Sequence, residues 1–217
     1  MKQRALAVVV SAAIVCVVIG LYIGLYLTAH PGTAVASKVP GGSQLYLATV
    51  PSAALSDPHP TWVSYYSVNS QHGDWQHKTT YVVPAHSLVH VTIFQYDSAT
   101  GLRNNYLGEA VGTAGGTIQV NGQTTVAVDP NGASHLFAIP ALGLSVPLPG
   151  ISASAKNPCS NAPCTGDDFV KINFSFRTGA KGVYRWQCFV PCGAGYIQGF
   201  GGPMQTVGYM DGFLKVV

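Results

Sequence analysis

The sequence predicts an all-β domain, a sandwich or barrel, from residue 61 onward. Short runs rich in Val, Ile, Thr, Tyr and Phe recur there between Gly, Pro, Asn and Asp residues, a pattern typical of strands joined by turns. Asn121 and Gly122 follow one such run, and an Asn-Gly pair accepts the positive φ angles of a type I′ hairpin turn. No stretch of the domain has the apolar period of a helix. About eight to ten short strands in one domain indicate two packed sheets or a barrel.

The expected strands are separated by stretches that contain Gly, Pro, Asn or Asp. They are residues 61–68, 79–84, 87–96, 116–120, 124–128, 135–140, 144–149, 170–178, 182–190 and 212–217.

Length and composition limit the number of domains and the classes of binding partner. The 217 residues suit one domain with an appendage. Charged residues make up only 9% of the chain, against about 25% in a typical soluble domain. The net charge of +3 provides no basic patch, which argues against a nucleic-acid partner.

The N-terminus predicts a membrane anchor at residues 1–28. Residues 5–29 carry no charge, and about 25 residues at about 1.5 Å each can cross a bilayer core of about 30 Å. Lys2 and Arg4 precede this stretch, so the positive-inside rule places the C-terminal domain outside the cytoplasm. The alternative is a cleaved signal peptide ending at the A-x-A pattern of residues 34–36. Both alternatives place the domain outside the cytoplasmic membrane.

Residues 29–60 are rich in Pro, Gly, Ser and Ala, and they are predicted to be a linker between the anchor and the domain at 61–217.

The cysteines fall into groups. Cys16 lies in the apolar N-terminal segment. Cys159 and Cys164 are predicted to form a short-loop disulfide, because thiols outside the cytoplasm tend to be oxidised. Cys188 and Cys192 lie close enough in sequence to form a second disulfide. Four cysteines allow three connectivities, so pairing between these two groups also stays open.

Side chains that could perform independent catalysis are not arranged in a recognisable pattern. His86 and His90 would share a strand face about 13 Å apart, which is too far to hold one metal ion. Asp167 and Asp168 would point apart in an extended chain, so they form no acid/base pair. His135 differs because it begins a strand that continues through alternating apolar residues to a Pro-Gly turn.

The chain resembles subunit II of haem-copper respiratory oxidases, whose extracytoplasmic cupredoxin domain carries the dinuclear copper centre CuA. The residues that carry the resemblance are "VVPAHSLVHVTIFQYD" (82–97), His135, "LPG" (148–150), "FSF" (174–176) and "GVYRWQCFVPCG" (182–193), in the family's order. The match covers roughly residues 80–217. It implies a cupredoxin-like Greek-key β-sandwich with one N-terminal transmembrane helix and insertions near 98–130, 152–168 and 195–210.

The resemblance also implies a ligand set, from which this sequence departs. The family uses two cysteines, two histidines, a methionine and a backbone carbonyl from between the cysteines. His135, Cys188 and Cys192 match this set. Tyr196 stands at the second histidine position and Gly199 at the methionine position, so an incomplete CuA centre is expected. The candidate copper ligands are therefore His135, Cys188, Cys192 and, if the loop is rearranged, Met204.

The resemblance implies a function as a subunit II-like component of a membrane-bound haem-copper terminal oxidase or a related respiratory complex. Such a subunit would be at most a non-catalytic part of a cytochrome c or quinol oxidase, with the other subunits as partners and copper as its cofactor if the ligands suffice. Trp186 is either an aromatic residue through which electrons enter or a core residue. Two alternatives remain open: a stand-alone membrane-anchored copper protein for electron transfer, and a disulfide-stapled structural or interaction domain.

Overall fold

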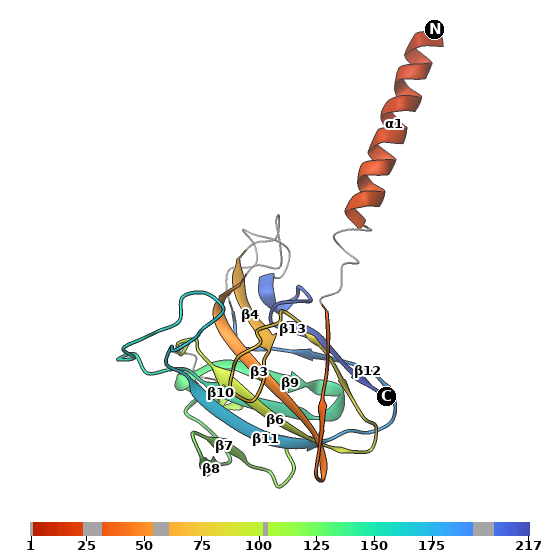
Figure 1. Ribbon diagram of the computed structural model, residues 1–217. Coiled ribbons are helices and arrows are strands. Elements are labelled where there is room, and N and C mark those ends of the chain that lie inside the picture. The colour runs from red at the N-terminus through yellow and green to blue at the C-terminus, as the bar shows by residue number, and fades with distance from the viewer. Residues whose placement is uncertain (1, 24–31, 54–60, 102–103, 193–201) are drawn as a thin grey trace. The chain divides into compact units, whose positions relative to one another are not determined.

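A computed structural model describes residues 2–23, 32–53, 61–101, 104–192 and 202–217 (Figure 1). The chain divides into two compact units, Met1–His30 and Pro31–Val217.

The first unit is built around helix α1, Lys2–Tyr22. Among the helices that the structure describes, none is both long enough and apolar enough to cross a membrane. The transmembrane helix expected at residues 1–28 is therefore not confirmed.

The second unit consists of two β-sheets, as the sequence predicts. The first, called sheet A, has the spatial order β1 (Thr33–Val35), β5 (Thr80–Val83), β13 (Asp211–Val216), β12 (Gly182–Gln187), β9 (Ala133–Ile139) and β10 (Leu144–Pro149). The second, called sheet B, has the order β2 (Ser37–Val39), β3 (Gly42–Ala53), β6 (Leu88–Gln95), β11 (Val170–Arg177), β7 (Ile118–Val120) and β8 (Gln123–Thr125), with β4 (Trp62–Ser67) paired to β3. Short 3-10 helices lie in the connections between strands: η2 (Asn105–Gly108), η3 (Pro130–Gly132), η4 (Pro140–Leu142) and η5 (Gly202–Met204).

The predicted hairpin at Asn121 and Gly122 is confirmed. Both residues have positive φ angles, 49° and 86°. They connect β7 to β8, whose ends pair as Val120 with Gln123. The strand expected at 124–128 is shorter and begins earlier than predicted, because β8 covers only Gln123–Thr125.

The structure differs from the sequence prediction at the linker. Residues 33–53, expected to lie within a linker at 29–60, form strands β1, β2 and β3. In β3 the buried side chains of Leu45 and Leu47 alternate with partly exposed neighbours, which is the pattern of a half-buried strand. The Pro and Gly residues of this stretch belong to the turns and to an irregular pairing between Val50 and Ala53.

The main core lies between the sheets. Trp186 of sheet A packs edge-on against Tyr65 of sheet B, with ring centroids 4.7 Å apart, and it stacks on Tyr81 and Phe137. All four side chains are fully buried. Such large aromatic side chains dominate the stability of a core.

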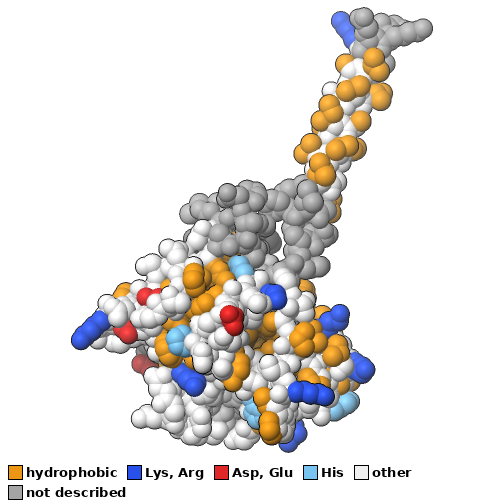
Figure 2. All heavy atoms as spheres, in the orientation of Figure 1, with side chains coloured by type: hydrophobic (Ala, Val, Ile, Leu, Met, Phe, Trp, Pro, Cys, Tyr) orange, Lys and Arg blue, Asp and Glu red, His pale blue; other side chains and the backbone are white. Residues whose placement is uncertain are grey.

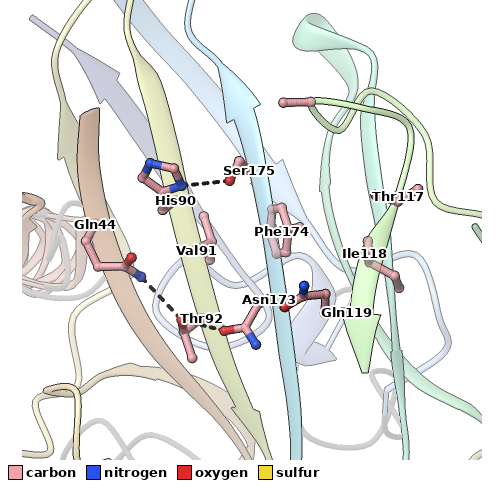
Figure 3. A pocket seen from close by; sticks show the side chains of 11 residues that line it. Gln44, His90, Val91, Thr92, Thr117, Ile118, Gln119, Asn173, Phe174 and Ser175 are labelled. Carbon is pink, nitrogen blue, oxygen red and sulfur yellow. Dashed lines mark hydrogen bonds between the residues drawn. The ribbon is translucent and has the colours of Figure 1, made fainter. Parts of the chain in front are cut away.

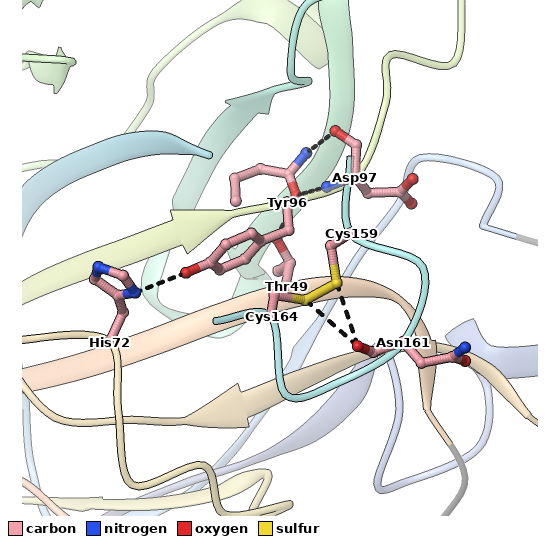
Figure 4. Close-up of a disulfide and its surroundings, with 8 residues drawn as sticks. Thr49, His72, Tyr96, Asp97, Cys159, Asn161 and Cys164 are labelled. Carbon is pink, nitrogen blue, oxygen red and sulfur yellow. Dashed lines mark hydrogen bonds between the residues drawn. A yellow bond between two sulfur atoms is a disulfide. The ribbon is translucent and has the colours of Figure 1, made fainter. Parts of the chain in front are cut away.

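A second, smaller core lies on the other face of sheet B. Phe94 and Tyr96 of this cluster pack with Cys159 and Cys164, and they alternate along the chain with Ile93, which faces the main core. The predicted Cys159–Cys164 disulfide is confirmed (Figure 4).

Candidate metal centre

The candidate ligands from distant parts of the sequence meet inside the sandwich. His135 lies near the start of β9, Cys188 follows the end of β12, and Cys192 lies in the loop beyond. One ligand atom from each residue lies within 4.8 Å of the other two. All three residues are buried, with exposed fractions of 2%, 0% and 4%.

The imidazole of His135 is held from both sides. Its Nδ1 atom lies 3.1 Å from Sγ of Cys192. Its Nε2 atom lies 3.1 Å from Oδ2 of Asp97, which stands two residues after the end of β6. The ring therefore joins sheet A, through β9, to the end of a sheet B strand.

The two sulfur atoms face one another without a bond. Cys188 and Cys192 are free cysteines whose Sγ atoms lie 3.3 Å apart, whereas a disulfide bond measures about 2.05 Å. The carbonyl oxygen of Val190, between them in sequence, lies 2.9 Å from Sγ of Cys192 and 3.6 Å from Sγ of Cys188. The backbone N–H of Leu136 donates to Sγ of Cys188 at 3.3 Å. The structure therefore does not contain the alternative predicted from the sequence, a Cys188–Cys192 disulfide.

Met204 also reaches this centre. Its Sδ atom accepts a hydrogen bond from the backbone N–H of Cys192 at 3.2 Å. Its carbonyl accepts one from the side-chain amide of Gln187 at 2.6 Å, which ties η5 to the end of β12. Met210 contributes its backbone instead, because its carbonyl accepts from the N–H of Cys188 at 2.9 Å.

The buried groups shift one another's protonation in the metal-free protein. Burial disfavours charge on His135, but hydrogen bonds with Asp97 and Cys188 outweigh it and raise the pKa of the imidazole to about 9. Burial also disfavours the thiolate of Cys188, but hydrogen bonds from Cys192 and His135 lower the pKa of this thiol to about 5. Burial, together with the neighbouring Cys188 sulfur, raises the pKa of the Cys192 thiol well above its ordinary value. The site therefore favours one thiolate beside one imidazolium.

The donor set suits a soft metal ion. Two buried thiols and one buried imidazole converge, and a partly buried thioether lies beside the backbone of Cys192. Thiolate, thioether and imidazole are ligands that copper accepts. The second group with metal-ligating atoms, Cys159, Cys164 and Asp167, differs because its cysteines are joined in a disulfide.

Other residues singled out in the sequence lie elsewhere. Trp186 has no exposed surface and donates its indole N–H to the carbonyl of Thr79 at 2.8 Å. It therefore belongs to the core, and an electron-entry role for it stays a prediction. Tyr196 and Gly199 lie outside the described residues.

His90 lies in a shallow polar groove away from the metal centre. The groove, about 330 Å³ in volume, is on sheet B beside residues 114–119 (Figure 3). His90 contacts Ser175 at 2.8 Å, and Thr92 connects Gln44 to Asn173 through hydrogen bonds. His86 precedes β6 in a turn with a φ angle of 49°, so it does not share a strand face with His90 as predicted.

Several site residues were missed by sequence reasoning. Asp97 is the most important of them, because it contacts His135 from 38 positions away. One signal could have found it: in a chain with only 8 acidic residues, Asp97 stands at the end of a predicted apolar strand. The contacts of Gln187 with Met204 and of Leu136 with Cys188 left no comparable signal.

The visible surface of the sandwich has few charged side chains. Figure 2 shows Lys, Arg, Asp and Glu scattered over the face in view rather than gathered into a patch.

Comparisons with known proteins give distant likenesses. No family model matches the chain, and no curated protein does. Among solved structures, a histidine-to-methionine variant of rusticyanin is 16% identical, with 88% of this chain and 86% of that chain covered and a TM-score of 0.36. Rusticyanin from Thiobacillus ferrooxidans is also 16% identical, with 90% and 92% covered and a TM-score of 0.32. A chain of a haem-copper terminal oxidase dimer is 13% identical, with 100% and 97% covered and a TM-score of 0.34. At these TM-scores the likenesses carry no argument about function.

Proposed function

We propose that this protein is a copper-binding electron-transfer domain of the cupredoxin type, acting as a subunit II-like component of a haem-copper terminal oxidase or a related respiratory complex. The observation that carries the proposal is the convergence of His135, Cys188 and Cys192, with the Met204 sulfur beside the backbone of Cys192. These three residues, His135, Cys188 and Cys192, stand at the positions that resemble the ligand positions of subunit II.

His135 Nδ1 and the two cysteine sulfurs would hold the metal, with the Met204 thioether and the Val190 carbonyl beside them. Copper bound there would supply one-electron transfer. The chain's own part is to keep these donors in place and to exclude water. Tyr65 contributes to both, because its buried ring packs in the core and its hydroxyl donates to the carbonyl of Leu136 at 3.0 Å.

The compartment we propose is extracytoplasmic. The Cys159–Cys164 disulfide supports this location, because disulfides persist in oxidising compartments and are rare in the cytosol. The proposed partners are the other subunits of the respiratory complex, and a stand-alone copper protein is the alternative.

Copper reconstitution of the full-length protein tests the proposal. Reduced protein is loaded with copper, freed of excess metal, and analysed for copper per chain and for thiolate-to-copper absorption bands. We expect bound copper in the wild type and loss of the bands in Cys188→Ser and Cys192→Ser. One or two coppers per chain would distinguish a mononuclear from a dinuclear centre. Absence of both copper and bands in the wild type would leave the structural or interaction domain as the better interpretation.

Met204→Leu tests the thioether separately, with Met210→Leu as its matched control. Both exchanges nearly conserve side-chain volume and should cost less than about 1.5 kcal/mol of stability. Met204 directs its sulfur to the backbone of Cys192, whereas Met210 meets Cys188 through its carbonyl. We therefore expect altered copper bands and reduction potential in Met204→Leu and unchanged ones in Met210→Leu. Equal spectra in the two variants would remove Met204 from the ligand set.

Purification of the protein from native membranes tests the partner. Haem that co-purifies in a stable complex supports the oxidase subunit, whereas copper without haem or other chains supports the stand-alone copper protein.

A further inference from the structure

A chain of buried hydrogen bonds leads from sheet B to the candidate metal centre. The hydroxyl of Thr49 donates to Oε1 of Gln95 at 2.6 Å. Oε1 of Gln95 also accepts from the backbone N–H of Asp97 at 2.8 Å, and its Nε2 donates to the carbonyl of Asp97 at 2.9 Å. The carboxylate of Asp97 then meets Nε2 of His135 at 3.1 Å.

Strand register accounts for this arrangement. Thr49 of β3 and Gln95 of β6 are paired neighbours in sheet B. Each comes two residues after a side chain that faces the main core, Leu47 and Ile93, and side chains two apart share a face of a strand. Thr49 and Gln95 have exposed fractions of 0%. They therefore extend the inward face of sheet B from its apolar centre to the metal end.

Gln95 fixes the backbone of Asp97, and Ser98 fixes its carboxylate. The two hydrogen bonds of the Gln95 amide involve both the N–H and the carbonyl of Asp97. The backbone N–H of Ser98 donates to Oδ1 of Asp97 at 2.7 Å. Oδ2 is left to face His135.

We propose that Asp97, clamped by Gln95 and Thr49, is the positioning residue that fixes the orientation and tautomer of His135 for metal binding. A carboxylate only accepts hydrogen bonds, so the imidazole proton stays on Nε2. The imidazolium of the metal-free site carries a second proton on Nδ1, beside Sγ of Cys192. A metal ion that binds there displaces this second proton, and the Nδ1 lone pair then points toward the sulfurs. A carboxylate or carbonyl behind a ligating histidine commonly has this role, and its loss typically costs 10–100-fold in metal affinity. The inference rests on the proposed function only for its metal-binding part.

The first readout needs no metal. In the metal-free protein, the Nε2–H of His135 should give a slowly exchanging signal in ¹⁵N-resolved NMR spectra, because Asp97 accepts that proton in a buried site. The signal should persist in Glu109→Gln, which removes one acidic group from the exposed surface. It should be lost in Asp97→Ala and retained, with faster exchange, in Asp97→Asn, whose amide oxygen can still accept the proton.

The second readout is affinity for Cu(I), measured by competition with a chromogenic chelator. We expect binding about 10–100-fold weaker in Asp97→Ala, a smaller loss in Asp97→Asn and in Gln95→Ala, and no change in Glu109→Gln. Circular dichroism establishes that each variant is folded, and Asp97→Asn replaces Asp97→Ala if the latter is not.

The two proposals fail in different ways. Wild-type protein that binds no Cu(I) overturns the copper function, while the Nε2–H signal still decides whether Asp97 holds the ring. An unprotected Nε2–H in the wild type, or one that survives in Asp97→Ala, overturns the positioning role. Wild-type Cu(I) affinity in a folded Asp97→Ala variant does the same.

Discussion

Cys188 and Cys192 are chemically unequal although their sulfur atoms lie 3.3 Å apart. Cys188 receives hydrogen bonds from Cys192, from His135 and from the Leu136 amide, which together outweigh its burial and lower its pKa. Cys192 is buried next to that negative charge, which raises its own pKa. One proton shared between two sulfurs is therefore the expected state of the metal-free site near neutral pH.

Titration of the metal-free protein tests this inequality. In a Cys192→Ser background, where the serine hydroxyl can still donate to the Cys188 sulfur, ultraviolet thiolate absorbance should report a pKa of the Cys188 thiol below its ordinary value of 9.0. Because this pKa is lowered in the folded state, the thiolate stabilises the fold at alkaline pH, and that stability is lost as the pH falls through about 5. Addition of His135→Gln should raise the pKa, since the imidazolium is removed. A thiolate that first forms near pH 9 in both proteins would contradict the prediction.

At the scale of residues, the sequence predicted ligands more readily than their supports. His135, Cys188 and Cys192 stand in motifs whose order along the chain is recognisable. Asp97 stands in no motif with His135, and their contact depends on which strand ends meet after folding. Second-sphere contacts of this kind cannot be read from spacing.

Among the elements, β13 is pressed closely between its neighbours β5 and β12. A Cβ atom on Gly212 would lie 2.0 Å from the carbonyl oxygen of Thr79 and 2.7 Å from Nε1 of Trp186. That carbonyl is also the acceptor for the Trp186 indole. Gly212 therefore allows the sheet and the core aromatic residue to approach one another.

Gly212→Ala should destabilise the protein by about 1–3 kcal/mol or more, because a well-packed core has to shift to admit the methyl group. Chemical denaturation gives the free energy of unfolding. Gly179→Ala is the matched control, since a Cβ there meets nothing within 4 Å. Similar unfolding free energies for Gly212→Ala and the control would show that the β13–β5 contact is looser than described.

Strand prediction succeeded where local chemistry decides the outcome. The runs from residue 61 onward alternate between apolar and polar side chains, and the Asn121–Gly122 turn has the dihedral angles that its residues favour. Pro147 and Pro149 are tolerated because β10 is the last strand of sheet A, where a missing N–H costs no ladder bond on the outer side. Prediction failed for β1–β3, whose Pro and Gly residues suggested a linker although the strands pair with distant partners.

For the whole molecule, the disulfide and the candidate metal centre lie in separate parts of the sandwich. Cys159–Cys164 closes a loop with a sequence separation of 5 in the outer cluster of sheet B. His135, Cys188 and Cys192 belong to the interior between the sheets. Loss of the disulfide should therefore lower the free energy of unfolding and leave metal binding nearly unchanged.

The double variant Cys159→Ala/Cys164→Ala tests this separation. Loop-closure entropy for so short a loop predicts a loss of about 2 kcal/mol in unfolding free energy. Copper per chain and the thiolate-to-copper bands should match those of the wild type. Weaker copper binding in a folded double variant would show that the outer cluster supports Asp97 through its neighbour Tyr96.

Strands β1 and β2, which follow one another in the sequence, belong to different sheets. Thr33 of β1 pairs with Thr80 in sheet A, and Ser37 of β2 pairs with Gln44 in sheet B. Ala36, between these strands, donates its N–H to the carbonyl of Val82. Residues 33–39 thus form hydrogen bonds with both sheets and connect them. Tension on the chain ahead of Thr33 would load the parallel β1–β5 ladder in shear, with its hydrogen bonds strained side by side. We expect the sandwich to resist mechanical peeling from this end and to yield as one unit.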